Sequence, residues 1–322
     1  MVGLDRSTRS RGFTLIELLV CLSVATALIC LLVPAIQASR EAARRAQCRN
    51  HLRQLALATH MFHDSHSKLP PMEIADSWAT WAVFLLPYLE QSGLYQQWQL
   101  DRRYHAQPAS AGQDLPVFHC PSRPTASIPL LGTGGLFREG WVRGPLGWSD
   151  FGAVGGTSLR RNNGVFATAI DSSTNLPSAQ IGSGSTTQSV MTQHPGWRLP
   201  LRFRDHALDG LSHTLAFGEM HVLPTPPLDS VFDGDNASAY QRCLGRDGPL
   251  HPVTQRYMVE FPIVDQPRFT GINWSNRFGS AHAGICHFAL LDGSVRPFSV
   301  STDLEVLHRL AARNDGLPVS LP

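Results

Sequence analysis

The feature that most constrains this chain is an apolar run close to its N-terminus. The run extends from Phe13 to Val33 and is apolar except for Thr14, Ser23, Thr26 and one carboxylate, Glu17. At about 1.5 Å per residue it forms roughly 30 Å of helix, which is about the thickness of a bilayer core. The sequence therefore predicts a transmembrane helix. Its glutamate needs an explanation, because a charge inside a bilayer is costly.

The composition constrains the part of the chain after this run. The chain has 322 residues with 27 glycines and 23 prolines, which favours a loop-rich body over a helical bundle. The net charge of +2 gives no global electrostatic argument for binding nucleic acid. The basic residues do gather directly after the apolar run, and their position near a membrane favours contact with lipid headgroups or other subunits over DNA. They are Arg40, Arg44, Arg45, Arg49 and Arg53.

The apolar run continues into an amphipathic pattern. Apolar residues recur at alternating steps of four and three between Cys48 and Phe62, so one helix is predicted over roughly 14–66. Pro34 is expected to bend or interrupt this helix. We divide the chain into a leader (1–12), a transmembrane segment (13–36), an amphipathic continuation (37–69) and a globular domain (70–322).

The globular domain carries signals for strands and turns. "SHTLAFGEM" (212–220) and "VFHCPS" (117–122) are predicted strands, and a stretch over 77–98 is helical with an interruption at Pro87. The run "GICHFALLDGSVRPFSV" (284–300) predicts a hairpin with a two-residue turn at Asp292-Gly293. A closing helix is predicted with a capping box of Thr302 and Glu305. The expected fold class is α+β, with the long N-terminal helix packed on a domain that contains an antiparallel sheet.

The N-terminus resembles a known export signal. A basic leader that ends in glycine, followed by "FTLIE" and an apolar run, is similar to the class III signal of type IV prepilins and pseudopilins. In that family a prepilin peptidase of the inner membrane cuts after the glycine and methylates the new N-terminus. The resemblance implies cleavage between Gly12 and Phe13 and N-methylation of Phe13. Pro34 falls where many pilins carry a helix-breaking proline.

This resemblance also implies an explanation for Glu17. Within one chain the carboxylate lies in the positive field of a helix N-terminus. In an assembled filament, Glu17 of one subunit would meet the amine of Phe13 in its neighbour, so that two charges neutralise each other in lipid. A glutamate merely tolerated near the membrane interface is the alternative. An ordinary secretory signal cut after Ala38 is also possible, but its apolar part would exceed the usual length of about 7–15 residues.

The rest of the chain resembles an uncharacterised family of pseudopilin-like exported proteins. The similar blocks are "CRNHLRQLALATHMFHDSHSKLPP", "FLLPYLEQSGLY", "FHCPS", "DGLSHTLAFGE" and "HAGICHFALLDGSV". The family signature is a histidine, nine residues and then Asp-Gly, which His282, Asp292 and Gly293 match. The family supplies no biochemical activity to transfer, and the loops over 123–200 depart from its usual pattern.

Several groups of polar residues are candidate sites. His282 and Asp292 allow a pair, a metal ligand set or an acid–base site, or else a histidine beside a hairpin and an aspartate required by its turn. His60, His63 and His66 are spaced around a helix, and His206, His213, Glu219 and His221 match no zinc motif. Asp229, Asp233 and Asp235 would allow calcium without forming an EF-hand. With no GxSxG, P-loop or GxGxxG motif, we expect no catalytic residue, cofactor or metal.

The six cysteines divide between the membrane and the exported domain. Cys21 and Cys30 lie inside the apolar run. The remaining four allow two disulfides in an exported domain. Cys48 on the helix seam is predicted to pair with Cys120, and Cys243 with Cys286 follows by elimination.

These features lead to one expected function and one alternative. The expectation is a pseudopilin or minor-pilin-like structural subunit of a type II secretion or type IV pilus-like assembly, without enzymatic activity. Its partners would be the prepilin peptidase, other pilin-like subunits and lipid of the inner membrane, and no nucleic acid. The globular domain would lie on the periplasmic side of a single-pass anchor. The alternative is a membrane-tethered binding protein or enzyme that uses the signal only as an anchor.

The first prediction concerns processing. The mature protein is expected to begin at N-methyl-Phe13, because the peptidase requires the small residue Gly12 before the cut. Intact-mass measurement and N-terminal sequencing of the membrane fraction check this. A chain that begins at Ser39 would instead identify a secreted protein without an anchor.

Overall fold

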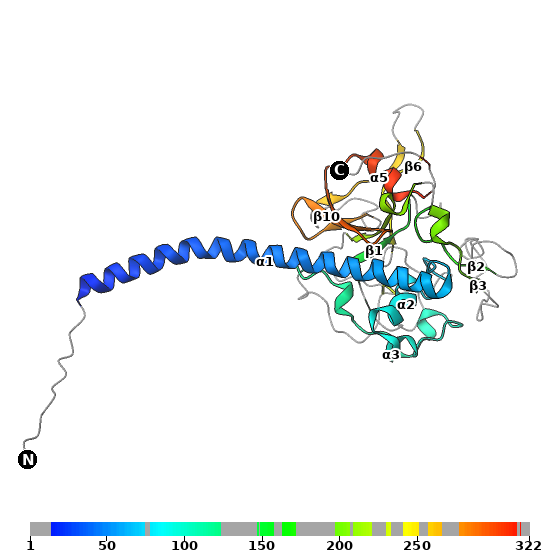
Figure 1. Ribbon diagram of the computed structural model, residues 1–322, viewed down its shortest axis with the longest axis horizontal. Helices are drawn as coiled ribbons and strands as arrows, with labels where there is room; N and C mark the ends of the chain where they lie inside the picture. The colour runs from blue at the N-terminus through cyan, green and yellow to red at the C-terminus, as the bar shows by residue number, and fades with distance from the viewer. Residues whose placement is uncertain are drawn as a thin grey trace, which may run out of the picture. The chain divides into compact units, whose positions relative to one another are not determined.

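The computed structural model describes most of the predicted helix and the framework of the domain (Figure 1). The described residues are 14–74, 78–123, 147, 149–157, 163–171, 197–206, 209–220, 230–232, 241–250, 257–265, 277–313 and 316. The chain divides into two compact units, Met1–Arg44 and Arg45–Pro322, which are described separately. Gly12 and Phe13 lie outside the described residues, as do most of the loops over 123–200.

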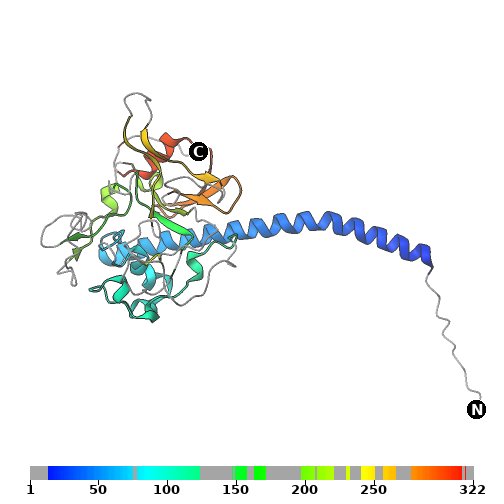
Figure 2. The same ribbon diagram turned by 180° about the vertical axis from the view of Figure 1, so that it is seen from behind.

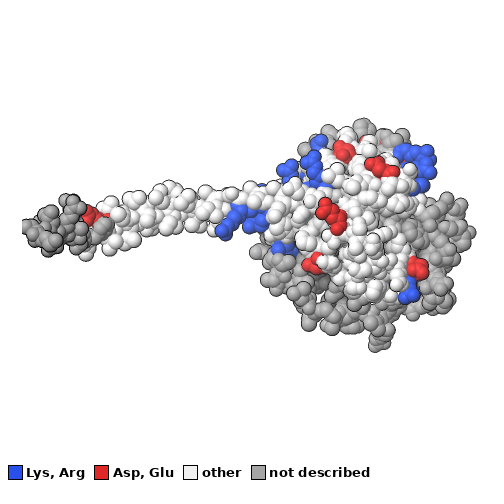
Figure 3. All heavy atoms as spheres, turned by 60° about the horizontal axis from the view of Figure 1, so that its bottom comes forward, with Lys and Arg blue, Asp and Glu red and all other residues white. Residues whose placement is uncertain are grey.

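Helix α1 extends over Leu15–His66, and its apolar part lies in the first unit, which ends at Arg44. It is the only helix in the described residues that is long and apolar enough to cross a membrane. None of the side chains in its most apolar window is buried, as a lipid-facing helix requires. The helix continues through Pro34, so of the bend or interruption predicted at that residue the interruption is wrong. Basic side chains first appear on α1 beyond the apolar part (Figure 3), where Arg44 pairs with Glu41 at 2.7 Å.

The second part of α1 belongs to the domain and is amphipathic, as predicted. One seam is buried and begins at Cys48, whereas Arg49 and Arg53 on the other side are exposed. This seam packs on a hydrophobic core that includes Phe151 and Phe217 of the central sheet. Both ribbon views place this part of α1 beside the sheet (Figures 1 and 2). The buried seam residues are Cys48, Leu52, Leu55, Ala56, Ala58, Thr59 and Phe62.

The central sheet is mainly antiparallel. Its strand order is β11-β10-β4-β1-β5, and only the outer pair, β1 with β5, is parallel. The strands are β1 (Phe151–Val154), β4 (Leu215–Glu219), β5 (Gln241–Arg242), β10 (Ile285–Leu290) and β11 (Val295–Ser299). The α+β prediction is confirmed, and so is the strand predicted within 212–220.

The hairpin β10–β11 is confirmed, but its turn is longer than predicted. Leu290 N–H donates to the Ser294 carbonyl at 2.8 Å, and Gly293 N–H donates to the Leu290 carbonyl at 3.0 Å. The loop therefore has three residues and ends at Gly293, whose φ is +86°. A type I turn followed by a left-handed glycine gives this loop, whereas the two-residue type I′ turn requires positive φ at Asp292 as well. Asp292 stabilises the turn by accepting hydrogen bonds from the N–H and hydroxyl of Ser294.

A second core lies on the other face of the sheet and is covered by helix α5 (Leu304–Ala311). Residues along β10 alternate between the two cores: Phe288 and Leu290 belong to this one, and Ala289 belongs to the core under α1. The N-cap of α5 is Asp303, which accepts from Glu305 N–H at 2.7 Å. The predicted capping box of Thr302 is therefore wrong, because Thr302 donates to the Ser299 carbonyl instead.

Short elements complete the domain. The predicted interruption at Pro87 is confirmed, since helices α2 (Trp81–Leu85) and α3 (Ser92–Tyr95) flank the 3₁₀ turn η1 (Leu86–Leu89). The segment 116–118 forms a 3₁₀ turn, η4 (Pro116–Phe118), and not the predicted strand, because Pro116 favours the start of a helical turn.

The other strands in the described residues are β2 (Ile170–Asp171), β3 (Trp197–Arg198), β6 (Gly245–Leu250), β7 (Tyr257–Phe261), β8 (Val264–Asp265) and β9 (Gly279–Ser280). The described residues also contain the 3₁₀ turns η2 (Tyr104–Ala106), η3 (Ala109–Ala111), η7 (Phe203–His206) and η8 (Leu211–His213).

The packing of β4 on the second core gives a testable prediction. A Cβ at Gly218 would lie 2.8 Å from Cδ1 of Phe278 and in closer conflict with the Phe288 ring. We expect Gly218→Ala to lower the free energy of unfolding by about 1–3 kcal/mol, because overpacking forces both rings to move. Thermal unfolding of the detergent-solubilised protein should show a Tm decrease of about 2–4 °C per kcal/mol.

Gly93→Ala is the matched control for this prediction. No atom lies within 4 Å of a Cβ built at Gly93, which is part of helix α3. Its Tm should stay unchanged or rise slightly, because alanine has less freedom in the unfolded chain. Equal Tm values for the two variants would contradict the packing described for Gly218.

Candidate functional site

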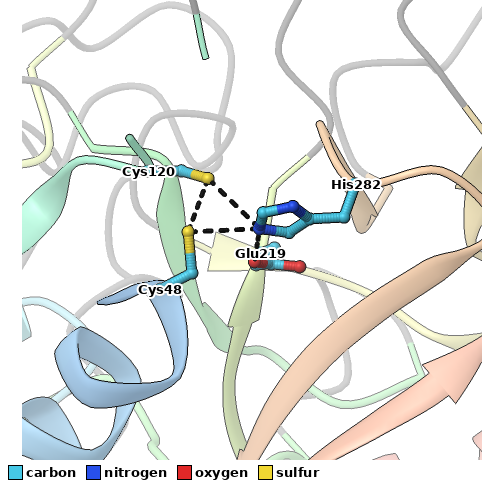
Figure 4. Close-up of side chains that lie close together, drawn as sticks. All are labelled: Cys48, Cys120, Glu219 and His282. Atoms are coloured by element: carbon cyan, nitrogen blue, oxygen red, sulfur yellow. Dashed lines mark hydrogen bonds and ion pairs between the residues drawn. The ribbon is translucent and has the colours of Figure 1, made fainter. Parts of the chain in front are cut away.

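Four polar side chains meet beneath helix α1: Cys48, Cys120, Glu219 and His282 (Figure 4). Each offers one ligand-type atom, and these atoms all lie within 4.8 Å of one another. All four residues are buried, with exposed fractions of 0%, 4%, 2% and 1% in the order given. We call this group the Cys/His/Glu cluster.

Each member comes from a different part of the fold. Cys48 lies on the buried seam of α1, and Cys120 follows the turn η4. Glu219 ends strand β4 and lies two residues after Phe217, so both side chains point to the α1 face of the sheet. His282 lies between strands β9 and β10. Helix packing on the sheet therefore assembles the cluster from residues that are far apart in sequence.

The distances place the His282 ring nitrogen at the centre of contacts to the other three. Nε2 of His282 lies 3.3 Å from Sγ of Cys48, 3.6 Å from Sγ of Cys120 and 3.4 Å from Oε1 of Glu219. The two sulfur atoms are 2.6 Å apart. Two sulfurs, one imidazole nitrogen and one carboxylate oxygen thus lie within 4.8 Å of one another.

The carboxylate of Glu219 is held in place from its other side. Its Oε2 accepts a hydrogen bond from the backbone N–H of His287 at 2.8 Å. Nδ1 of the His287 ring lies 3.3 Å from the same oxygen. Burial alone would raise the pKa of Glu219, but hydrogen bonds from His287 and Ser280 outweigh it and hold the pKa below its usual value. Ser280 also accepts from His282 N–H at 3.0 Å, so one hydroxyl positions two members of the cluster.

Asp150 fixes the loop that carries Cys120. Its Oδ2 accepts the N–H of Cys120 at 2.7 Å, and its Oδ1 lies 2.5 Å from Nε of Arg123. Asp150 is almost fully buried. Burial raises the pKa of this carboxyl, although the Arg123 guanidinium opposes the shift. Arg123 thereby compensates a charge that would otherwise be isolated.

The two cysteines of the cluster shift each other's pKa values. Their hydrogen bond has the largest effect on both, raising the pKa of Cys48 and lowering the pKa of Cys120 to about 6. Burial works against the lowering at Cys120, and a hydrogen bond from His282 supports it. The lowered pKa favours a thiolate within this pair of cysteines, which is the form that binds a metal ion or acts as a nucleophile.

Of the two predicted cysteine pairs, the structure shows a contact between Cys48 and Cys120 and other partners for Cys243 and Cys286. The structure brings Cys48 and Cys120 together, and both are free cysteines. Cys286 donates to the Glu219 carbonyl at 3.5 Å, and Cys243 forms a β-bridge with Arg277; these two are also free cysteines. Both disulfides stay predictions.

The structure separates His282 from Asp292. They lie at opposite ends of strand β10, and Asp292 serves the hairpin turn. The histidine-to-Asp-Gly signature thus spans one strand from the cluster to the turn, and it does not form a pair. The sequence indicated His282 as a possible metal ligand, but it did not connect His282 with Cys48, Cys120 and Glu219. Their placement in four separate similar blocks was the only signal available.

The other histidine groups have structural contacts. His63 stacks on Phe203 with ring centroids 4.1 Å apart, and His66 stacks on Phe62 at 4.2 Å. His60 bonds the Leu291 carbonyl at 2.8 Å, which ties α1 to the hairpin. The three histidines therefore contact the rest of the domain and are not gathered into a ligand set. His221 and the three aspartates of the calcium hypothesis, Asp229, Asp233 and Asp235, lie outside the described residues.

The start of α1 forms a capping box. Thr14 N–H and the Thr14 hydroxyl donate to Oε2 of Glu17 at 2.9 Å and 2.8 Å, and Glu17 N–H donates back to the hydroxyl at 3.3 Å. This reciprocal arrangement satisfies two backbone donors at the helix N-terminus. Glu17 thus has a local function in its own helix, in addition to the dipole effect expected from the sequence.

Comparison with known families agrees with these features. A model described as the prokaryotic N-terminal methylation motif matches residues 7–29. Together with the exposed apolar helix, this motif defines a type IV pilin-like exported protein, processed by a prepilin peptidase and anchored by one helix. A second model, described as a protein of unknown function (DUF1559), matches residues 37–305, and the chain belongs to this family. Both resemblances inferred from the sequence are confirmed. No curated protein and no solved structure gives a significant match.

The ion pair of Arg123 and Asp150, which holds the loop of Cys120, gives a prediction for the stability of the domain. Arg123→Gln should lower the free energy of unfolding by about 3–5 kcal/mol near pH 7, because a buried carboxylate loses its partner. The pKa of Asp150 in the folded state, already raised, should rise further above its unfolded value. Protonation of Asp150 then favours the folded state. The difference in free energy of unfolding between the parent and Arg123→Gln should therefore shrink as the pH falls from about 7 to about 5. Urea unfolding across this range measures it.

The double variant Arg123→Gln/Asp150→Asn is the control. The amide keeps the shape of the side chain without its charge, so most of the stability should return and the additional pH dependence should vanish. A deficit in Arg123→Gln that is constant across this pH range would contradict the ion-pair explanation.

Proposed function

We propose that this protein is a pseudopilin or minor-pilin-like structural subunit of a type II secretion or type IV pilus-like assembly. Its partners are other pilin-like subunits, and its globular domain lies on the periplasmic side of the inner membrane. The observation that carries this proposal is the apolar part of α1, which is exposed along its whole length and carries a single acidic residue at its start.

The capping box leaves Glu17 able to serve a second partner. Both hydrogen bonds from Thr14 end on Oε2, and in the described part of the chain Oε1 accepts none. A neighbouring subunit would bring the N-terminal amine of Phe13 to this oxygen. Such an ion pair favours association in lipid, because each charge alone is unfavourable there.

The proposal includes no enzymatic activity. In the described residues the most concentrated group of reactive side chains is the Cys/His/Glu cluster, and its members are at most 4% exposed. A substrate would have no direct access to them. Substrate sites are normally concave and open to ligands.

The capping box also favours the alternative of a tethered protein. It explains Glu17 within a single chain, so a membrane anchor that never assembles would retain the residue. In that case the exported domain would act alone and would tolerate any other anchor. Filament and anchor therefore differ in whether the charge of Glu17 is needed by a second chain.

Glu17→Gln separates these two functions. Glutamine can also complete a capping box, so the helix start should persist while the charge is lost. Membrane insertion and cleavage after Gly12 should continue. Disulfide crosslinking between subunits through cysteines introduced at Leu18 or Val20, with Cys21 and Cys30 replaced, should fall several-fold at an unchanged protein level.

Thr14→Ala is the complementary control. It removes the cap at a cost of about 1 kcal/mol but keeps the carboxylate, so subunit crosslinking should be largely retained. Equal crosslinking in the parent and in Glu17→Gln would show that Glu17 serves only its own helix, and the tethered protein would then be the better description.

A further inference from the structure

The Cys/His/Glu cluster contains more ligand chemistry than a disulfide needs. A bridge between Cys48 and Cys120 would use the two sulfurs and leave a buried carboxylate and an imidazole facing it. His287 pairs with Glu219 through Oε2, whereas Oε1 of the same carboxylate faces His282. Oε1 of Glu219 lies 3.4 Å from Nε2 of His282, and the same nitrogen contacts both sulfurs (Figure 4). The arrangement therefore requires a reason beyond cysteine pairing.

We propose that Cys48, Cys120, Glu219 and His282 bind one zinc ion that fastens helix α1 to the central sheet. Thiolate, imidazole and carboxylate are the three kinds of side chain that bind zinc in proteins. Two soft sulfur ligands argue against magnesium or calcium, which prefer oxygen. This inference is independent of filament assembly, because all four residues belong to the globular unit.

The spacing of the ligand atoms fits a tetrahedral site. With Zn–S of about 2.3 Å and Zn–N or Zn–O of about 2.0–2.2 Å, tetrahedral angles place sulfur about 3.6 Å from nitrogen and nitrogen about 3.4 Å from oxygen. The observed separations are 3.3 and 3.6 Å for sulfur to nitrogen and 3.4 Å for nitrogen to oxygen. The edges of the tetrahedron that meet at His282 are already present.

The sulfur–sulfur distance lies between two chemical states. The 2.6 Å separation is longer than a disulfide bond of about 2.05 Å and shorter than the roughly 3.8 Å between two zinc-bound thiolates. Zinc binding therefore requires the sulfurs to move apart by about 1 Å. Zinc and the disulfide exclude each other, because a bridged sulfur no longer provides a thiolate.

The surroundings of the cluster match those of a structural zinc ion. Four protein ligands close the coordination sphere, and their burial leaves no position for a substrate. Glu219 is oriented by His287, and Ser280 links Glu219 to His282, as the outer partners of metal ligands commonly do. Zn²⁺ would bind both sulfurs as thiolates, and any proton that they still hold would leave to solvent; with His282 neutral, the filled site would carry one negative charge.

Metal analysis of the full-length protein tests this proposal. The protein is extracted in detergent under anaerobic, chelator-free conditions, and zinc is measured by mass spectrometry against protein concentration. We expect about one zinc per chain in the parent and in Cys243→Ala, whose buried thiol lies outside the cluster. Cys48→Ala and His282→Ala should lose the zinc. Chelation of the parent should lower its Tm, because binding energy contributes to folding.

Cobalt substitution keeps the test valid if a variant folds poorly. The metal-free parent titrated with Co²⁺ should show visible bands of a tetrahedral ion and thiolate-to-cobalt charge transfer. Glu219→Gln retains both thiolates, so it should keep the charge-transfer intensity while binding at least about 10-fold more weakly in chelator competition, since even the loss of an outer partner costs that much. Cys120→Ser should lose about half of that intensity per cobalt, because one thiolate remains.

Two results would overturn the proposal. One is a parent chain that contains no zinc and binds no Co²⁺ after reduction. The other is a Cys48–Cys120 disulfide in essentially all of the protein when thiols are alkylated before cell lysis and peptides are mapped without reductant. The second result would establish the cluster as an oxidised structural bridge.

Discussion

The packing of the second part of α1 on the central sheet is the constraint on which the rest of the domain depends. One seam of the helix, from Cys48 to Phe62, forms a common core with Phe151 and Phe217 of the sheet. The burial of this apolar surface fixes which face of β4 and β10 points inward. The same helix also begins in the other compact unit, where its side chains are exposed on all sides. One continuous element therefore meets two different environments, and its surface changes accordingly.

The helix also buries polar groups, which is a cost that the domain must offset. Asp150 is paired with Arg123 and with the N–H of Cys120, and Glu219 accepts from His287. These contacts satisfy much of the hydrogen-bonding capacity of the two carboxylates. In addition, four ligand-type atoms gather within 4.8 Å of one another where the helix meets the sheet. A metal ion there would stabilise the contact on which the domain depends, at the position where the helix enters the core.

The N-terminal half of α1 is governed by different physics. In lipid, helix packing gains little from the hydrophobic effect, so a specific polar contact has more influence on association. Glu17 combines a local cap with a carboxylate oxygen that a neighbouring chain can use. The proposed zinc site and the proposed assembly contact therefore lie on one helix but in separate units, and each can fail without the other.

The sequence by itself determined the features that arise from local pattern. Continuous apolarity predicted the membrane helix, alternating steps of three and four predicted the buried seam, and the leader before Phe13 identified the export signal. Prediction from the sequence was less reliable where neighbouring residues compete for one position. The N-cap of α5 is Asp303 and not Thr302, and the hairpin turn has three residues and not two. The sequence predicted that Cys48 and Cys120 come together, but only the tertiary structure added Glu219 and His282 to them. Cys48 and Cys120 lie 72 residues apart, and Cys48 and His282 lie 234 apart, so no local spacing links them. They meet because the helix seam covers the inward face of β4, and that contact is a property of the packed core.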